Sequence, residues 1–570
     1  MSVGLLRSIA LSAAIATGLS APNLASAVDA APDGFAAAYL AGHIAERRGD
    51  SAVAAERLGA ALELAPETPA LRRRVVRLQL AEGDFAAAAV GAEALAALGD
   101  DNFPVGLVQI VQRFKSGDFA GAAEMANDPR AHGLSTVLAL LAKAWASAGA
   151  GDVDGGAKML TDAAKKMNGL KVLLTLHAGL MAEQAERPEL ARWMYEEAIA
   201  ASEADQRPAS GRLIQVVAGF YDRMGQDEAA AEARAIDGAQ TERPEDTAAI
   251  GRIVVSPAEG LAEALYNIAG SLFTDRQYHQ ALIYVRLAAV LRPNEPATLF
   301  TIGQILDGLG RPREAADAYR AIPALGSYGW RAPMRVAESL SDAGEEEAAI
   351  EAMRAVLDTA PEQPEPAIAL GHMLRGAGRF KQAIEAYDEA IARKGGAGDE
   401  DGWLLYARGV ALERSGDWPA AEAEFLKALD MLGDEPLVLN YLGYTWIDRG
   451  EHLERGRAMV ARAVELRPDD GFIRDSLGWA EFRMGDFEAA AASLERAVAL
   501  QPLDPIINEH LGDAYWRVER YREARFQWRR ALSFGPDEKQ KPVIEEKLQC
   551  GLDGCPAAAA PATKANGDGG

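Results

Sequence analysis

The sequence predicts an all-α protein in which pairs of helices repeat along the chain. Two observations lead to this prediction. The 570-residue chain is 49% hydrophobic but only 7% aromatic. Much of its apolar fraction is therefore alanine, which favours thin, closely packed helices over one bulky core. In addition, residues 471–504 and 505–538 align with each other at a spacing of one 34-residue block.

Each 34-residue block divides into two amphipathic helices of roughly 13 residues joined by a short turn. The aligned positions carry small residues and a proline: Gly478 with Gly512, Ala490 with Ala524, Ala497 with Ala531, and Pro502 with Pro536. We expect the small residues at the crossing of the two helices, where they let the backbones approach. The proline ends the second helix because it cannot continue the hydrogen-bond ladder.

This pattern resembles the tetratricopeptide repeat (TPR) family over nearly the whole chain after its N-terminus. The resemblance implies a right-handed superhelical α-solenoid of about twelve or thirteen helix–turn–helix repeats. Further repeats are expected at residues 262–295, 296–329, 330–363, 364–397, 403–435 and in a block that ends at Pro468. The N-terminal half is looser, with repeats at 35–68, 172–202 and 210–235 and two degenerate ones within 103–166.

The pattern also predicts a division into domains. An N-terminal degenerate array covers residues 28–235, a linker covers 236–259, and a C-terminal array with its capping helix covers 260–549. The linker contains two prolines and a β-branched run at 253–255, which interrupt the repeat. Residues 541–549 are expected to cap the array, with Ile544 and Leu548 inward and Lys547 outward. Residues 550–570 form a cysteine pair and a disordered tail.

The first 27 residues are typical of a secretory signal peptide. An apolar run at 8–19, too short to span a bilayer, is followed by Ala25-Ser26-Ala27, an A-x-A cleavage pattern. The alternative is an amphipathic first helix. No cysteine lies near the cleavage site, and no later run reaches 18 apolar residues. We therefore expect an exported, periplasmic chain that is not lipidated and has no transmembrane segment after cleavage.

In an oxidising compartment Cys550 and Cys555 can form a local disulfide, with a redox-active pair as the alternative. Two cysteines and seven scattered histidines leave little for a metal site. The sequence contains none of the common nucleotide-binding, hydrolase, metalloprotease or calcium-loop motifs. The sequence thus predicts no enzyme, no cofactor and no metal. A formal net charge of −25 argues against a nucleic-acid-binding face.

The TPR resemblance also implies a binding surface. In that family, side chains of the first helix of each repeat line a concave groove. The last four repeats place aromatic and polar residues at these positions: Trp403, Tyr406, Asn440, Tyr441, Tyr444, Asp475, Trp479, Phe482, Arg483, His510, Asp513, Trp516 and Arg517. Aromatic rings among polar groups suit a peptide groove because they bury area at little entropic cost. Alternatively, some of these aromatics pack between helices or under the capping helix.

The C-terminal segments NYLGYTWIDRG, DSLGWAEFRMG and INEHLGDAYWRVERYREARFQWRRAL are similar to those of Gram-negative envelope TPR proteins. One type in that group is a lipoprotein adaptor that presents cell-wall hydrolases to a periplasmic carboxyl-terminal processing protease. The resemblance implies a protein–protein adaptor with two binding regions, one in each half. This chain departs from that type because it lacks the lipid-accepting cysteine. The alternative is a structural scaffold in an envelope secretion or polysaccharide-export assembly. Neither the specific partner nor an oligomeric state follows from the sequence.

Overall fold

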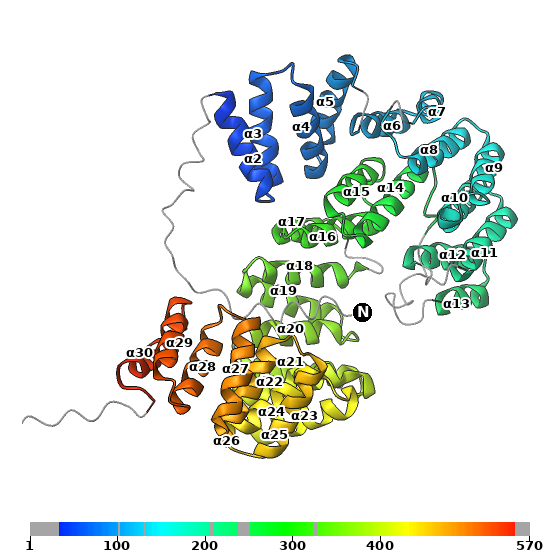
Figure 1. Ribbon diagram of the computed structural model, residues 1–570. Coiled ribbons are helices and arrows are strands. Elements are labelled where there is room, and N and C mark those ends of the chain that lie inside the picture. Colours follow the sequence, from blue (N-terminus) through cyan, green and yellow to red (C-terminus); the bar gives the residue numbers. More distant parts are fainter. Residues whose placement is uncertain are drawn as a thin grey trace, which may run out of the picture. The chain divides into compact units, whose positions relative to one another are not determined.

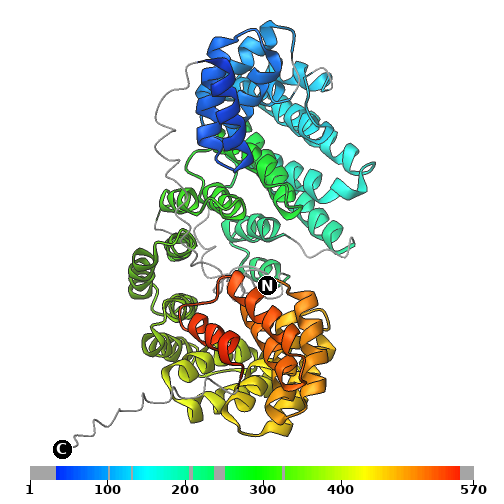
Figure 2. The same cartoon turned by 60° about the vertical axis from the view of Figure 1, so that its left-hand side comes forward.

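The computed structural model describes residues 34–100, 103–129, 132–204, 210–236, 251–323 and 328–552. Within these ranges the regular elements are helices, and no strand occurs. The expected signal peptide and Cys555 lie outside the described residues. The described chain divides into two compact units, residues 34–360 and residues 361–552. We call them unit 1 and unit 2. Figures 1 and 2 show that successive helix pairs stack along each unit.

Unit 1 contains α2 to α19. Their bounds are α2 (Phe35–Arg47), α3 (Ser51–Leu64), α4 (Pro69–Glu82), α5 (Phe85–Ala97), α6 (Val105–Ser116), α7 (Phe119–Asn127), α8 (Thr136–Gly149), α9 (Val153–Ala164), the 3-10 helix η2 (Asn168–Leu170), α10 (Lys171–Gln184), α11 (Pro188–Ala204), α12 (Gly211–Arg223), α13 (Asp227–Ala235), α14 (Pro257–Thr274), α15 (Tyr278–Leu291), α16 (Pro296–Gly308), α17 (Pro312–Arg320), α18 (Arg331–Asp342) and α19 (Glu346–Thr359).

Unit 2 contains α20 to α30. Their bounds are α20 (Glu365–Gly376), α21 (Phe380–Arg393), the 3-10 helix η5 (Asp399–Asp401), α22 (Gly402–Ser415), α23 (Trp418–Leu432), α24 (Pro436–Arg449), α25 (Leu453–Leu466), α26 (Gly471–Met484), α27 (Phe487–Leu500), α28 (Pro505–Arg517), α29 (Tyr521–Ser533) and α30 (Gln540–Cys550). Among the described residues, helices α2 to α29 form fourteen pairs. The predicted all-α repeat fold is therefore confirmed, with slightly more pairs than the twelve or thirteen expected.

The two helices of a pair cross at small residues, as expected. Ala490, Ala497, Ala524 and Ala531 are all fully buried. A Cβ added to Gly512 would lie 2.4 Å from the ring of Trp528, which belongs to the second helix of the same pair. The same relation links other glycines to an aromatic ring: Gly179 to Tyr195, Gly303 to Tyr319, Gly371 to Tyr387 and Gly409 to Phe425. A bare backbone in the first helix thus provides the space for a large ring from the second.

The turns within the N-terminal pairs have a strict register. Asp50, Asp84, Asp118 and Asp152 recur at the spacing of the repeat, and each follows a glycine with positive φ. The carboxylate of each accepts a hydrogen bond from the backbone N–H three residues later, which caps the second helix. The N-terminal half is therefore as regular in its turns as the C-terminal half, although its small-residue pattern is weaker.

Two residues of the expected linker pack into the core of unit 1. Ile253 and Val254 are each 2% exposed and belong to the same apolar cluster as α8 and α10. Residues 237–250 lie outside the described residues. The boundary between the two compact units falls between Ala360 and Pro361, which lies within the expected C-terminal array. Ile253 and Val254 therefore belong to the core, whereas Val255 is exposed.

Helix α30 caps unit 2 at the expected place. Ile544 is fully buried against α28 and α29, and Leu548 is partly buried beside it. The expectation that Lys547 faces outward was wrong. Its ammonium group lies 2.7 Å from Glu509 Oε1 and 2.6 Å from Asp513 Oδ2, and its side chain is only 16% exposed. Two buried carboxylates on α28 need a cation, and α30 supplies it.

Candidate functional site

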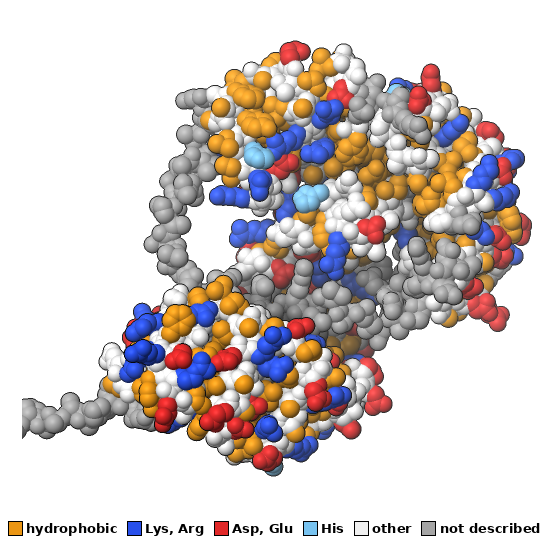
Figure 3. Space-filling view, in the orientation of Figure 1, with side chains coloured by type: hydrophobic (Ala, Val, Ile, Leu, Met, Phe, Trp, Pro, Cys, Tyr) orange, Lys and Arg blue, Asp and Glu red, His pale blue; other side chains and the backbone are white. Residues whose placement is uncertain are grey.

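The predicted groove residues of unit 2 lie on four first helices, α22, α24, α26 and α28. Helix α24 contacts α26, and α26 contacts α28, although each pair is separated in sequence by a second helix. These contacts give α24, α26 and α28 a continuous shared face. On the face drawn in Figure 3, cationic and anionic side chains are interspersed over unit 2 rather than separated into large areas of one charge.

The aromatic residues of α22 and the start of α24 hold the helices together. Tyr406 is 8% exposed, and its ring centroid lies 5.8 Å from those of Trp403 and Tyr441 in edge-on contacts. Tyr441 also packs on Phe425, and its hydroxyl donates a hydrogen bond to Glu413 Oε2 at 3.1 Å. Burial raises the pKa of Tyr406 to about 12, so this phenol is neutral. These rings therefore belong largely to the core.

The centre of the face is a stack that crosses from α26 to α28. The Trp479 ring stacks on His510 with centroids 4.3 Å apart and on Phe482 at 5.1 Å. His510 Nδ1 lies 2.9 Å from Asp475 Oδ1, which fixes the imidazole in place. The indole Nε1 of Trp479 is shielded from solvent and has no hydrogen-bond partner among the described residues. A buried donor without an acceptor is costly, so this N–H favours a ligand that supplies one.

The imidazole of His510 is held close to several carboxylates. Burial opposes its protonation, but the charge and hydrogen bond of Asp475, with help from Asp513 and Glu509, raise the pKa of His510 above its ordinary value. The stack on Trp479 therefore combines an aromatic surface with a protonatable donor. Such a surface suits polypeptide, because it offers apolar contact together with polar groups that fix orientation.

Helix α24 adds polar groups beside this stack. Tyr444 is half-buried, and burial, with Asp448 and Asp475 acting in the same direction, raises its pKa to about 12. Arg483 on α26 donates to the carbonyl of Asp448 at 3.2 Å. The side-chain oxygen of Asn440 is buried without a partner among the described residues. Phenol, amide and guanidinium groups thus lie along one strip of α24 and α26.

Of the predicted residues of the last repeat, Asp513 and Trp516 contact the capping helix, whereas Arg517 lies at the surface. Asp513 Oδ1 accepts a hydrogen bond from Trp528 Nε1 at 2.9 Å, and its other oxygen accepts from Lys547 of α30. A Cβ on Gly551 would lie 2.0 Å from the ring of Trp516, so the end of α30 covers this indole. Asp513 and Trp516 therefore close the end of the array. Arg517 is exposed, 6.0 Å from the Phe487 ring centroid.

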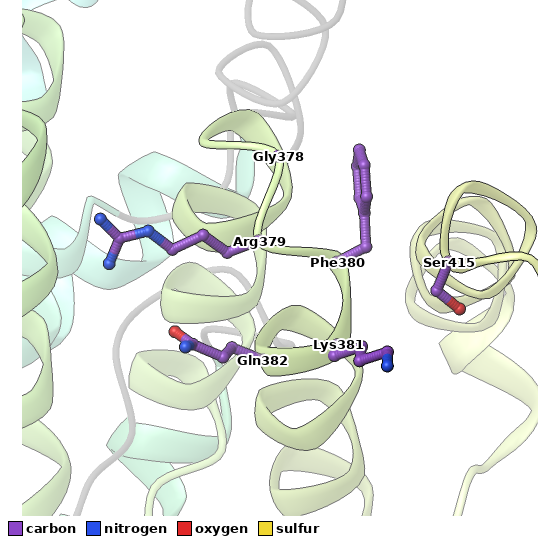
Figure 4. A pocket seen from close by; sticks show the side chains of 6 residues that line it. All are labelled: Gly378, Arg379, Phe380, Lys381, Gln382 and Ser415. Carbon is purple, nitrogen blue, oxygen red and sulfur yellow. The ribbon is translucent and has the colours of Figure 1, made fainter.

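A separate hollow lies away from these residues. A cavity of about 330 Å³ lies between the start of α21 and the end of α22. Figure 4 shows Phe380 and Ser415 on either side of it, while Arg379 and Gln382 point to the opposite side of α21. Among the described residues there is no cluster of acidic, histidine or cysteine side chains that could hold a metal ion. None of the described helices is long and apolar enough to cross a membrane.

Comparisons with known proteins place these helix pairs in a family. A family model described as tetratricopeptide repeat matches residues 300–364, 368–436 and 476–538. A TPR repeat-containing protein of Pseudomonas aeruginosa is 29% identical over 193 residues, which cover 33% of this chain and 31% of that protein. The chain thus spans less than a third of the length of this curated relative.

The solved structures that match this chain are distant from it in sequence. The Cut9–Hcn1 hetero-tetramer of the APC/C matches with 14% identity and a TM-score of 0.38, over 90% of this chain and 96% of that one. Yeast Tom70 matches with 14% identity and a TM-score of 0.34, over 91% and 95%. YrrB, described as a TPR protein with an unusual peptide-binding site, matches with 19% identity and a TM-score of 0.28, over 34% and 98%. The family match therefore shows that the chain contains tetratricopeptide repeats, and the fourteen helix pairs continue the same helix-pair fold outside the matched residues.

Proposed function

We propose that unit 2 binds a polypeptide segment along α24 and α26, with the Trp479 stack at its centre. The observation that carries this proposal is the shielded Trp479 N–H without a partner among the described residues, set in an aromatic stack beside Asp475 and His510. A peptide carbonyl would satisfy this donor, and the ring would cover an apolar side chain. The tetratricopeptide repeat fold itself favours a role in protein–protein interaction.

The cellular role that fits this groove is a non-enzymatic, exported adaptor. The A-x-A pattern after an apolar run supports export to the periplasm. The similarity of the C-terminal segments to envelope TPR adaptors supports partners such as a processing protease and cell-wall enzymes. The alternative remains a scaffold of a secretion or polysaccharide-export assembly, in which the groove would not select the partner.

The groove is tested by Trp479→Ala in the full chain. The probe is a set of fluorescent peptides selected from a random-sequence peptide library on the wild-type protein. We expect the variant to bind the selected peptides at least about tenfold more weakly, since a central aromatic anchor carries much of the binding free energy. Trp193→Ala is the matched control, because Trp193 is an exposed tryptophan in unit 1.

Crosslinking in cells separates the two roles. Capture of a protease and cell-wall enzymes that is lost in Trp479→Ala but kept in Trp193→Ala would support the adaptor. Capture of export-machine components that persists in both variants would support the scaffold. Unchanged peptide binding by Trp479→Ala, with helical circular dichroism preserved, would rule out this groove.

A further inference from the structure

Unit 1 folds back on itself. Helix α14 contacts α6, α8 and α10, and α15 contacts α4 and α6, although α11, α12 and α13 separate α14 from the nearest of these helices in sequence. Each contacted helix is the first helix of its pair, the type that lines the inner face of a repeat array. In Figure 1 the green α14 and α15 accordingly lie inside the curve made by α2 to α13. The inner face of the N-terminal pairs is thus covered by the chain itself.

The apolar part of this contact depends on one glycine. Gly260 of α14 lies directly on the ring of Trp145 in α8, and a Cβ at this position would be 2.2 Å from the indole Cδ2. Trp145 is fully buried, and its Nε1 donates to His177 Nδ1 of α10 at 3.1 Å. Leu261, Ala264 and Leu265 continue the buried stripe of α14. A helix therefore enters this face only if it has a small residue opposite Trp145.

The polar part is a buried ion pair three residues further along α14. Arg212 of α12 donates from Nε and from its terminal nitrogen to the two oxygens of Glu263, at 2.8 and 2.5 Å. Their side chains are 8% and 2% exposed. The guanidinium also lies over the Tyr266 ring, 5.2 Å from its centroid. Glu295 lies 3.4 Å from the same guanidinium, but Glu263 alone accepts from both Nε and the terminal nitrogen at short distance. Loss of Glu263 would leave a buried arginine with one long ion pair, so this face favours an acid from its occupant.

We propose that the inner face of the N-terminal pairs is a groove for an amphipathic helix, and that α14 of this chain is its resident ligand. The recognition pattern is a glycine against Trp145, an apolar stripe, and a glutamate three residues later against Arg212. Unit 1 then binds a helix, whereas unit 2 is proposed to bind polypeptide along its own first helices. The two binding regions implied by the adaptor resemblance are therefore not equivalent. This inference does not depend on the Trp479 groove.

Helix α14 is covalently joined to the groove that it occupies, and this determines how the groove is tested. A segment joined to its site has an effective concentration of about a millimolar, so a free copy at micromolar concentration competes poorly. Full-length wild-type protein is accordingly expected not to bind a labelled peptide of residues 256–275. Loosening the resident helix should expose the groove and allow the peptide to bind.

The experiment compares two glycines of α14 in the full-length protein. Gly260→Leu places a side chain on the Trp145 ring, whereas Gly270→Leu is the control, because nothing lies within 4 Å of a Cβ at Gly270. We expect faster hydrogen exchange in α14 of Gly260→Leu, and at least about tenfold tighter binding of the wild-type peptide to it than to Gly270→Leu. A peptide carrying Gly260→Leu or Glu263→Gln should not bind.

Two results would overturn the proposal. One is an α14 that stays protected from exchange in Gly260→Leu. The other is an exposed α14 whose groove binds the wild-type and Glu263→Gln peptides equally. If Gly260→Leu does not fold, Glu263→Gln in the full-length protein replaces it. That variant keeps the size of the side chain on α14 but removes the negative charge that pairs with Arg212. Equal binding of the peptide to this variant and to the wild type would contradict the proposal.

Discussion

At the scale of single residues, the fold rests on glycines that face aromatic rings. The sequence predicted small residues at the helix crossings, and they are buried there. It did not predict that an aromatic ring from the second helix fills the space above the glycine, as Tyr387 does above Gly371. The sequence contains both the glycine and the aromatic residue of each pair. Whether they meet depends on the angle between the two helices, which the spacing of residues alone does not provide.

Gly371→Ala should therefore destabilise unit 2. The added Cβ would lie 2.3 Å from the Tyr387 ring, and we expect a loss of about 1–3 kcal/mol from overpacking. Gly376→Ala in the same helix meets nothing within 4 Å. This control should be neutral or stabilising by up to about 1 kcal/mol, because alanine favours the helix. Urea unfolding measures both, and equal midpoints for the two variants would contradict this packing at the helix crossing.

Buried His177 should make unit 1 sensitive to acid. Burial lowers the pKa of His177 from 6.5 to about 4, with Glu263 opposing this shift. Between these values the unfolded chain binds a proton that the folded chain does not. The contribution of His177 to stability is therefore complete above pH 6.5 and falls as the pH decreases toward 4, by up to roughly 3 kcal/mol.

The variant His177→Gln tests this pH dependence. The stability of unit 1 should fall less steeply with decreasing pH in this variant than in the wild type. Hydrogen exchange of α8 and α10 from pH 7 to 4.5 measures the difference. His372→Gln is the matched control, since burial also lowers the pKa of His372 to about 4, but in unit 2. If unit 1 of His177→Gln loses as much stability at acidic pH as the wild type, other groups cause this loss.

At the scale of elements, the ends of helices were predicted better than the polar contacts between helices. The capping helix was expected at 541–549 and is found as α30, from Gln540 to Cys550. The periodicity of this helix predicts that Lys547 faces solvent, because the residue is charged and lies opposite the apolar stripe. Its actual partners, Glu509 and Asp513, lie on α28, beyond the intervening α29, and the periodicity of one helix gives no information on them.

Lys547→Met should loosen the capping helix. The substitution leaves two mostly buried carboxylates without their cation, and we expect a loss of about 3 kcal/mol. Lys541→Met is the control, because Lys541 is exposed on the same helix. Limited proteolysis at the C-terminal end of α29 measures the effect. Equal protection of α29 in the two variants would indicate that Ile544 alone holds α30.

At the scale of the whole molecule, the sequence predicts the repeat. It does not predict that α14 and α15 pack back against the earlier helices of unit 1. A repeat array has contacts mainly between neighbouring pairs, and the repeat pattern encodes only those. The linker at 236–259 is predicted from its prolines and β-branched run, and it stays a prediction. The packing of Gly260 on Trp145 lies outside the repeat pattern. The candidate groove was predicted in part for the same reason. The sequence places Trp479 and His510 on first helices, but their stacking depends on how two repeats are rotated against each other.

Binding of polypeptide to the first helices of unit 2 is tested most directly by photocrosslinking in living cells. A photoreactive amino acid replaces Tyr444 on α24 in one variant and Phe526 on α29, which is 57% exposed, in the other. We predict protein crosslinks of defined mass from position 444, lost when Trp479→Ala is added, and none from position 526. Crosslinks from position 526 with none from position 444 would contradict the account.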